Sequence, residues 1–379
     1  MLKHRGQEGF SLIELLIVTT IIALVIIVSS DTFTIMLKQS SQTAKIVSSE
    51  IDSIIGINIL RYDVEHAGYG LPWKFRTTPS TTNYEAAAAI TASTYNDAPP
   101  NLPRAFVTGN NAGYNSSDYL VIKSTLAGTS DASQKWTYII QGGTPKVWGS
   151  TKLDLITNDR VIVIKPRVDE NSQNELVMDG ATFFTAFNAA AFPSAFSPSL
   201  PSERFLIYGV APVSAGETNL RMPFNRADYY IARPSANMPP SCAPNTGILY
   251  KATVNHGDGL LTEMPLLDCV ADMQVVFGRD TNSDGVVDNA TNNMTALALT
   301  AEQIRAQIKE VAIYILAQEG QVDTSYTHLT SSVTVGDTNA SSLYFGLGST
   351  FNLSSTIGTG WQNYRWKVHT LKIKPKQLY

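Results

Sequence analysis

A short loop in the last third of the chain has residues suited to metal chemistry. Its side-chain oxygens stand at alternate positions, from Asp280, Asn282, Asp284 and Asp288. Gly285 permits the sharp turn that lets them converge, and the carbonyl of Val286 would be a fifth donor, as in the first nine positions of a calcium loop. Thr291 stands where an EF-hand has its bidentate Glu, so another group must complete the shell. We expect Ca²⁺ here, and a hairpin of Asx turns is the alternative.

Two cysteines, Cys242 and Cys269, allow one disulfide and exclude a zinc site made of cysteines alone. If the surrounding domain is exported, an oxidising compartment would join them, and the bridge would stabilise the fold by about 3 kcal/mol. Two buried free thiols are the alternative. The sequence has no Cys-x-x-Cys, the motif of redox catalysis.

The histidines do not indicate an enzyme. None of them belongs to a metal-binding pair: His4, His66, His256, His328 and His369. His256 lies near Asp258 and could be imagined as a base, but we expect a solvated surface pair. Neither a Gly-x-Ser-x-Gly elbow nor a phosphate-binding loop is present. We therefore predict no catalytic residues and no enzymatic activity.

Length and charge limit the remaining classes. The 379 residues suffice for a large core, and 28 Lys and Arg against 32 Asp and Glu leave a net charge of −4. Nucleic acid is not an expected partner, because no basic excess is available to displace its counterions.

The N-terminal part of the chain predicts a membrane helix. An apolar run from Phe10 to Val28 is long enough to cross a bilayer, and Lys3 and Arg5 before it place its N-terminal end in the cytoplasm. Glu14 interrupts the run, and an ionised carboxylate in a membrane helix costs on the order of 3 kcal/mol. Glu14 therefore needs a partner, unless the run is a plain anchor with a tolerated Glu.

The segment Gly9-Phe10-Ser11-Leu12-Ile13-Glu14-Leu15-Leu16-Ile17 resembles the class III signal of type IV prepilins and pseudopilins. The resemblance implies that a prepilin peptidase cleaves between Gly9 and Phe10 and methylates the new amine of Phe10. It also implies that Glu14 is the carboxylate used in assembly. A positive amine and a carboxylate one turn apart can pair, within one chain or between neighbours, and offset the cost of burial.

The membrane helix is expected to continue into the exported part of the chain. Because no proline occurs before Pro72, a helix from Phe10 to about His66 is predicted, roughly 80 Å long. Its second half has apolar residues at helical spacing that we expect to lie on a sheet: Val47, Ile51, Ile54, Ile55 and Tyr62.

The rest of the chain predicts a β-rich head in the periplasm. Short β-branched and aromatic runs separated by turn residues favour strands at Tyr119–Lys123, Val161–Lys165, Phe205–Tyr208, Tyr229–Ile231, Ile248–Val254, Met273–Phe277, Val311–Leu316 and Trp366–Ile373. Thr300 and Gln303 form a capping box that predicts a helix. The expected fold is α+β and pilin-like, with a leader (1–9), a membrane and assembly helix (10–66) and a head (67–379). A division of the head is expected near 234–240, if it has two parts. The sequence does not indicate how residues 73–202 are arranged as a whole.

Five segments together resemble the PilW family of type IV minor pilins: the prepilin signal, Arg61–Gly70, Cys269–Asp288, Lys309–Gln318 and Tyr364–Val368. The resemblance implies a minor pilin that helps to initiate pilus assembly and sits in or near the pilus tip. Its partners would be other minor and major pilins, the prepilin peptidase and the inner-membrane assembly platform. It would span the inner membrane once before joining the extracellular pilus. A type II secretion pseudopilin similar to GspJ is the alternative, and a membrane-tethered enzyme is a more distant one.

Overall fold

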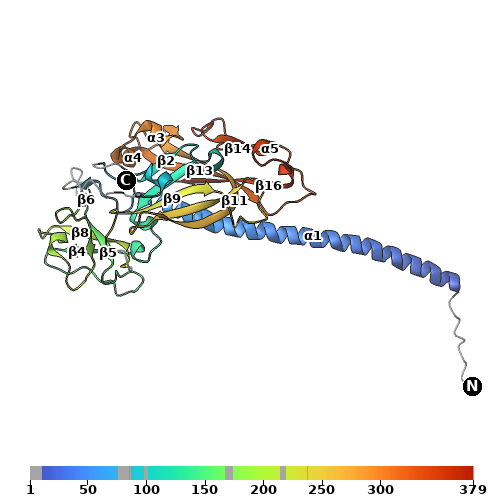
Figure 1. Cartoon of the computed structure of the whole chain (residues 1–379), viewed down its shortest axis with the longest axis horizontal. Coiled ribbons are helices and arrows are strands. Elements are labelled where there is room, and N and C mark those ends of the chain that lie inside the picture. Colours follow the sequence, from blue (N-terminus) through green and yellow to red (C-terminus); the bar gives the residue numbers. More distant parts are fainter. Residues whose placement is uncertain are drawn as a thin grey trace, which may run out of the picture.

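A long helix projects from a β-rich head (Figure 1). The computed structural model describes residues 11–75, 85, 87–97, 101–166, 174–213, 219–236 and 238–378. The helix α1 runs from Leu12 to Glu65 without interruption, which confirms the predicted long helix. Gly68 and Gly70 follow it in left-handed conformations, with φ of +87° and +70°. These conformations turn the chain into the head, because residues with a side chain rarely adopt them.

The larger sheet has eight strands and forms the body of the head. Its order is β16-β13-β11-β10-β9-β3-β2, with β12 paired to β11. The strands are β2 (Phe106–Gly109), β3 (Tyr119–Ser124), β9 (Asn225–Ala232), β10 (Gly247–Val254), β11 (Leu261–Arg279), β12 (Asn289–Thr291), β13 (Ile308–Glu319) and β16 (Arg365–Ile373). Every pairing in this sheet is antiparallel.

The two faces of the larger sheet are covered by different segments. The C-terminal part of α1 packs against β11, β13 and β16, and Leu60 and Val64 join the main core there. The second core includes Tyr314, Phe351 and Leu353. It brings together the larger sheet, the hairpin β14 (Ser332–Val335) with β15 (Ser349–Asn352), and α5 (Leu353–Thr356).

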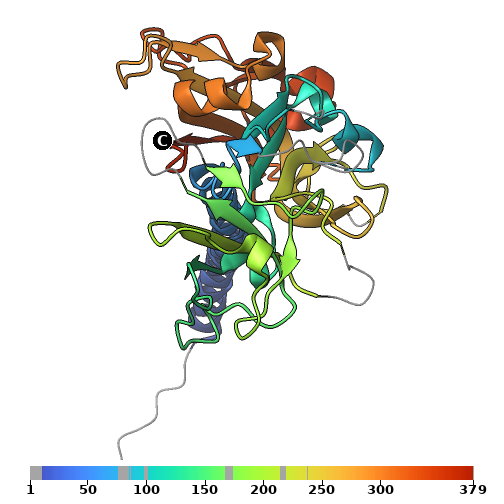
Figure 2. The ribbon, with the colours of Figure 1, turned by 90° about the vertical axis from the view of Figure 1, so that its left-hand side faces the viewer.

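A smaller six-stranded sheet lies at the end of the head far from the N-terminus (Figures 1 and 2). Its order is β1-β6-β5-β8-β4, with β7 paired to β5. The strands are β1 (Lys74–Phe75), β4 (Trp136–Ile140), β5 (Arg160–Lys165), β6 (Glu175–Leu176), β7 (Thr185–Ala186) and β8 (Arg204–Ala211). Most of this sheet is inserted in the chain between β3 and β9 of the larger one. The predicted division near 234–240 lies in the chain between β9 and β10, which pair with each other in the larger sheet.

The remaining helices are short. They are α2 (Ile90–Ser93), α3 (Met294–Leu297), α4 (Ala301–Gln307) and single 3₁₀ turns at Tyr114–Ser116, Thr125–Ala127, Ala132–Gln134, Ser194–Phe196 and Trp361–Asn363. The capping box of Thr300 and Gln303 is formed at the start of α4, as predicted. All eight predicted strands are present, because runs of β-branched and aromatic residues bounded by turn residues favour extended chain locally.

Candidate assembly site: the N-terminal helix and its junction with the head

The first turn of α1 uses Glu14 as part of its own cap. The backbone N–H of Ser11 donates to Glu14 Oε2 at 3.0 Å, and the Ser11 hydroxyl accepts from the N–H of Ile13 at 3.4 Å. The Glu14 carboxylate is therefore directed back along the helix, toward its N-terminal end. Gly9 and Phe10, the predicted cleavage and methylation residues, lie outside the described residues.

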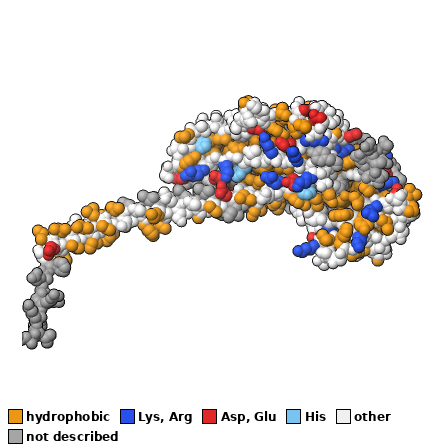
Figure 3. Space-filling view, turned by 180° about the vertical axis from the view of Figure 1, so that it is seen from behind, with side chains coloured by type: hydrophobic (Ala, Val, Ile, Leu, Met, Phe, Trp, Pro, Cys, Tyr) orange, Lys and Arg blue, Asp and Glu red, His pale blue; other side chains and the backbone are white. Residues whose placement is uncertain are grey.

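The N-terminal half of α1 projects from the head with its described side chains exposed. Leu12–Ser41 is long and apolar enough to cross a membrane, and its most apolar window has no buried residue among those that the structure describes. Hydrophobic side chains follow this projecting half of the helix (Figure 3). Apolar side chains exposed in this way need lipid or the apolar surface of another molecule.

The C-terminal half of α1 packs on the head with a different face from the predicted one. The expected apolar stripe is wrong for its described members: Val47, Ile54, Ile55 and Tyr62 are exposed, and the Ile51 side chain lies outside the described part. The packed face consists instead of Ser53, Gly56, Leu60, Asp63, Val64 and Ala67.

Gly56 explains why this face is chosen. A Cβ at Gly56 would lie 2.1 Å from the carbonyl oxygen of Leu266 in β11, so only glycine permits the observed approach of helix and strand. Bulky residues such as Ile54 and Ile55 could not face the strand this closely, and they point away from it.

Asp63 is a buried anchor between helix and sheet. Its Oδ2 lies 2.5 Å from Lys251 Nζ in β10 and accepts the Tyr229 hydroxyl of β9 at 2.6 Å. Burial raises the pKa of Asp63, and the Lys251 charge opposes that rise. Asp63 was not predicted from the sequence, where its place between the apolar Leu60 and Val64 at helical spacing was the one available signal.

Two exposed ion pairs flank the packed part of α1. Glu50 Oε1 lies 3.0 Å from Lys367 Nζ, and Glu65 Oε2 lies 2.5 Å from Lys376 Nζ. The N–H of Lys376 also donates to the carbonyl of Glu65 at 2.8 Å. The C-terminal strand and its extension thus run beside α1 from Glu50 to Glu65.

A second buried polar network joins Glu85 and Asp97 to the larger sheet. Lys123 and Arg226 are paired neighbours on β3 and β9, and both are fully buried. Lys123 Nζ contacts Glu85 at 2.6 Å and Asp97 at 2.5 Å. Arg226 contacts Glu85 at 2.8 Å and binds both oxygens of Asp228, at 2.7 and 2.8 Å. Cations and carboxylates alternate, so each buried charge has a partner.

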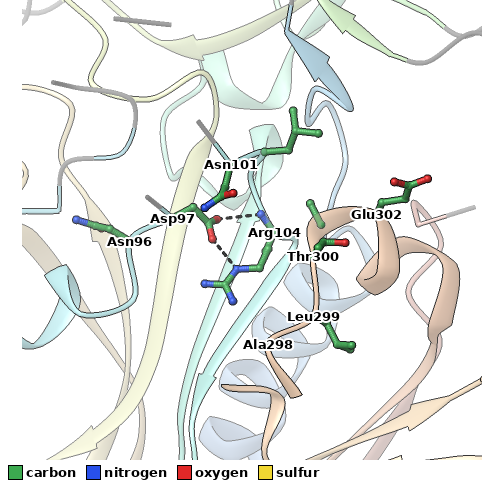
Figure 4. A pocket seen from close by; sticks show the side chains of 10 residues that line it. Asn96, Asp97, Asn101, Arg104, Ala298, Leu299, Thr300 and Glu302 are labelled. Atoms are coloured by element: carbon green, nitrogen blue, oxygen red, sulfur yellow. Dashed lines mark hydrogen bonds and ion pairs between the residues drawn. The ribbon is translucent and has the colours of Figure 1, made fainter. Parts of the chain in front are cut away.

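A pocket of about 560 Å³ lies beside this network (Figure 4). It is lined by Asn96, Asp97, Asn101, Leu102, Arg104, Ala298, Leu299, Thr300, Ala301 and Glu302. Asp97 accepts the Arg104 backbone N–H at 2.9 Å and its Nε–H at 2.5 Å. Burial would raise the pKa of Asp97, but Lys123 and Arg104 outweigh it and lower that pKa. Asp97 is thus an ion-paired anion with a structural role, which gives the pocket no general base at this position.

The loop predicted to bind calcium is folded by hydrogen bonds of its own. The Asp280 carboxylate accepts the N–H groups of Asp284 and Gly285 at 3.2 and 2.9 Å. Asp288 accepts the N–H and hydroxyl of Thr281, at 2.9 to 3.0 Å. Gly285 is left-handed, with φ of +87°, as the sharp turn requires.

These carboxylates are arranged around the loop and not at one point. Among the residues that the structure describes, no three His, Cys, Asp or Glu side chains are grouped as metal ligands. Lys309 Nζ also lies 3.8 Å from Asp280 Oδ2. The donor types and their order suit Ca²⁺, and calcium binding by this loop stays a prediction.

The disulfide between Cys242 and Cys269 is formed. Cys269 has a φ of +56° and precedes Val270, where β11 changes its partner from β10 to β13. The bridge therefore ties the segment before β10 to the point at which β11 leaves that strand.

His256 is not the solvated residue that we expected. It is buried; its Nδ1 accepts the Arg221 N–H at 3.3 Å and its Nε2 lies 3.1 Å from Asn225 Oδ1. Burial lowers the pKa of His256 to about 4, so the ring is neutral at pH 7. The surface-pair prediction is wrong because the loop folds inward, and Asp258 instead accepts the N–H of Leu260.

Comparison with known proteins places two parts of the chain. Residues 228–372, from β9 to β16, match the family described as type IV pilus-assembly protein W. Residues 4–30 match the prokaryotic N-terminal methylation motif. Arg61–Gly70 lies outside both matches. No curated protein and no solved structure matches the chain.

The two matches agree with the structure of the regions that they cover. The methylation motif coincides with the capped, exposed start of α1, and the PilW region supplies the strands onto which α1 packs. Both regions are typical of structural pilus components. The chain is a type IV pilus-related, pilin-like protein with a PilW region behind a prepilin methylation motif.

Proposed function

We propose that this protein is a minor pilin that takes part in initiating type IV pilus assembly and sits in or near the pilus tip. Before assembly it would span the inner membrane once, with its head in the periplasm. Its partners would be other minor and major pilins, the prepilin peptidase and the inner-membrane assembly platform. The matches to the PilW family and to the methylation motif support this role.

The observation that carries the proposal is the division of α1 into two halves. The part from Ser53 onward packs on the head, whereas the described side chains of Leu12–Ser41 are exposed. The same apolar side chains can face lipid before assembly and neighbouring helices in a filament afterwards, at little cost in hydrophobic free energy. Glu14 would then select the filament, because a neighbour's terminal amine can neutralise it there.

Replacing Glu14 with Ala tests this role. Membrane insertion should remain, because the change removes a charge from an apolar helix. Incorporation into pili should fall about tenfold or more, because the unpaired carboxylate costs on the order of 3 kcal/mol in the membrane and the variant loses the drive toward the filament that relief of this cost would supply. The measurement is the ratio of subunit in sheared pili to subunit in membranes, with the exposed Glu302→Ala as a matched control. Equal ratios for the wild type and Glu14→Ala would contradict the assembly role of Glu14.

The same strains can show whether the leader is processed. We propose cleavage between Gly9 and Phe10 and methylation of Phe10, as the methylation motif over residues 4–30 supports. Mass spectrometry of the wild type should find a methylated Phe10 at the N-terminus, and Gly9→Leu should retain residues 1–9. A wild-type subunit that begins at Met1 in pili would exclude this processing.

We also propose that the loop from Asp280 to Asp288 binds Ca²⁺. The support is the order of oxygen donors (Asp280, Asn282, Asp284, Val286 and Asp288) and the left-handed turn at Gly285. Each carboxylate oxygen of Asp280 and Asp284 accepts one hydrogen bond and keeps a second lone pair, whereas both oxygens of Asp288 accept several and would have to exchange some of them for the ion. Bound calcium would hold the loop against β11 and neutralise its acidic charge.

Thermal unfolding with calcium and with a chelator tests the metal site. Saturating calcium should raise the Tm of the wild type by about 2–4 °C, through preferential binding to the folded chain. The rise should disappear in Asp284→Ala and remain in Glu302→Ala, which changes an exposed carboxylate elsewhere. A calcium-dependent rise that is equal in wild type and Asp284→Ala would contradict the site.

A further inference from the structure

The loops on either side of the β13–β16 pair form one surface, which we call the rim: residues 320–331 and 357–366. Backbone hydrogen bonds tie its two segments together. The N–H of Asp323 donates to the carbonyl of Asn363, and the N–H of His328 donates to the carbonyl of Gln362, both at 2.8 Å. The rim is therefore an ordered surface of the head.

The position of the rim follows from the ion pairs along α1. Lys367 meets Glu50 and Lys376 meets Glu65, so this stretch of chain runs in the same direction as the helix. Residues before Lys367 consequently extend toward the N-terminal half of α1. Figure 1 shows the loops coloured orange to red on this side of the head.

Helix geometry places the rim near the membrane surface. The span Leu12–Ser41 has 30 residues, and its length of about 45 Å equals the thickness of a bilayer including its headgroups. Glu50 lies nine residues beyond Ser41, or about 14 Å. The six residues from Lys367 back to Trp361 can cover up to about 20 Å. The rim is thus within reach of the outer headgroups.

The side chains of the rim suit this position. Two aliphatic side chains of the rim are exposed, Leu329 at 92% and Val322 at 52%. Beside them lie the partly exposed Tyr326, Trp361 and Tyr364. Aromatic residues with a polar atom are favoured at membrane–water interfaces, because the ring is apolar and its edge can hydrogen-bond.

The rim has no net charge that would oppose contact with lipid. Its sequence contains one acid, Asp323, and one full cation, Arg365, which pair at 3.0 Å. Arg365 also stacks on the Tyr326 ring, 4.1 Å from its centroid. Burial lowers the pKa of His328, so this ring is neutral at pH 7.

We propose that the rim is a membrane-contact surface that lies in the headgroup region of the bilayer that α1 spans. The inference rests on the proposed membrane anchoring. Contact at the rim and insertion of α1 would hold the head in one orientation before assembly, and extraction into a filament would have to break both. The recognised partner is the phospholipid interface itself, without preference for lipid charge.

A fluorescent label at Leu329 tests the proposal in the full chain. Cys242 and Cys269 are paired, so Leu329→Cys provides the one reactive thiol for an environment-sensitive dye. The matched control is Leu200→Cys, 54% exposed in the segment before β8, far from the N-terminus. In phosphatidylcholine vesicles with nitroxide-labelled headgroups, the label at 329 should be quenched at least about twofold more than the label at 200. Adding phosphatidylglycerol or salt should not change this ratio, because the rim is neutral.

Each outcome decides the proposal. Equal quenching at both positions overturns the membrane contact. A label at 329 that is shielded from a water-soluble quencher and not quenched by lipid overturns it in favour of a protein partner, such as a second copy. Flotation with vesicles distinguishes membrane anchoring by α1 from membrane contact by the rim. A chain that fails to float is not anchored. A chain that floats with a water-exposed label at 329 is anchored but lacks the rim contact.

Intrinsic fluorescence provides a second measurement without a label. The five tryptophans all lie outside α1, at Trp73, Trp136, Trp148, Trp361 and Trp366. Brominated lipids should quench part of their emission, and Trp361→Phe should reduce that part, with the rim's other tryptophan, Trp366, as the source of any remainder. Trp148→Phe, in the smaller sheet's part of the head, should leave it. If Trp361→Phe leaves the quenched part unchanged, as Trp148→Phe should, the rim does not contact lipid.

Discussion

Buried carboxylates of this protein differ in the partners that surround them. Asp63 has the Lys251 ammonium, and Asp97 has Lys123 and Arg104. Asp118, in contrast, accepts hydrogen bonds from the backbone N–H groups of Asn111 and Val275, both at 2.8 Å. The negative charge of Asp272 adds to the rise of the Asp118 pKa. Burial raises the pKa of Asp118 to about 7. Backbone donors fix its position between the β2–β3 hairpin and β11, but they do not offset the lost hydration of a full charge.

The shifted pKa of Asp118 predicts a dependence of stability on pH. The folded chain keeps a proton on Asp118 up to about pH 7, whereas the unfolded chain loses it near the usual 3.8. The free energy of unfolding should therefore fall as pH rises through this window, by up to about 4 kcal/mol from this group. Denaturant titrations at several pH values should show a weaker fall for Asp118→Asn, with exposed Glu302→Gln unchanged. An identical slope in Asp118→Asn and wild type would refute the assignment.

The helix α1 shows how backbone contact can override hydrophobic pattern at the scale of one element. Its extent follows from local features: no proline before Pro72, a capping box at Ser11 and left-handed glycines after Glu65. Its orientation does not follow from them. The face with Gly56 packs because it brings the helix axis closest to β11, and Asp63 is accepted there because Lys251 is opposite.

Substitution of Gly56 should reveal this contact. In an ordinary helix interior, Gly→Ala stabilises by about 0.5–1 kcal/mol. At Gly56 the new Cβ would lie 2.1 Å from a backbone oxygen that cannot move freely, so Gly56→Ala should cost about 2 kcal/mol. Thermal unfolding in detergent gives the comparison, with Asn58→Ala on the exposed side of the helix as control. Unchanged or higher stability of Gly56→Ala would show that the helix and β11 do not meet as described.

The whole molecule depends on connections between segments that are distant in sequence. The smaller sheet is inserted between β3 and β9, and α1 reaches strands more than two hundred residues away, β11, β13 and β16. The disulfide closes a separation of 27 residues at the point where β11 changes partner. It therefore restrains the larger sheet, to which both α1 and the inserted sheet are attached.

Removal of this bridge should weaken the head as a unit. The double variant Cys242→Ser with Cys269→Ser should lose about 3 kcal/mol of unfolding free energy, because its unfolded chain is no longer closed into a loop. Urea titrations measure this loss. A reductant should destabilise the wild type by a similar amount and leave the double variant unaffected. A wild type that is insensitive to reductant under unfolding conditions would argue against the bridge.

Local patterns determined what a short stretch of this chain can form. The long N-terminal helix, the eight strands and the capping box of α4 depend on residues close in sequence, where periodicity and turn chemistry act directly. The N-terminal motif is equally local. For these features the printed residues were sufficient.

Only the tertiary structure decided which faces meet. Two predictions were wrong: the apolar stripe as the packed face of α1, and the exposure of His256. The smaller sheet and the network around Lys123 and Arg226 were not predicted. Each depends on a partner that lies far along the chain: Leu266 for Gly56, Asn225 for His256 and Glu85 for Arg226. Burial of a polar group becomes favourable only when its complement is brought to it, and that placement is a property of the folded chain.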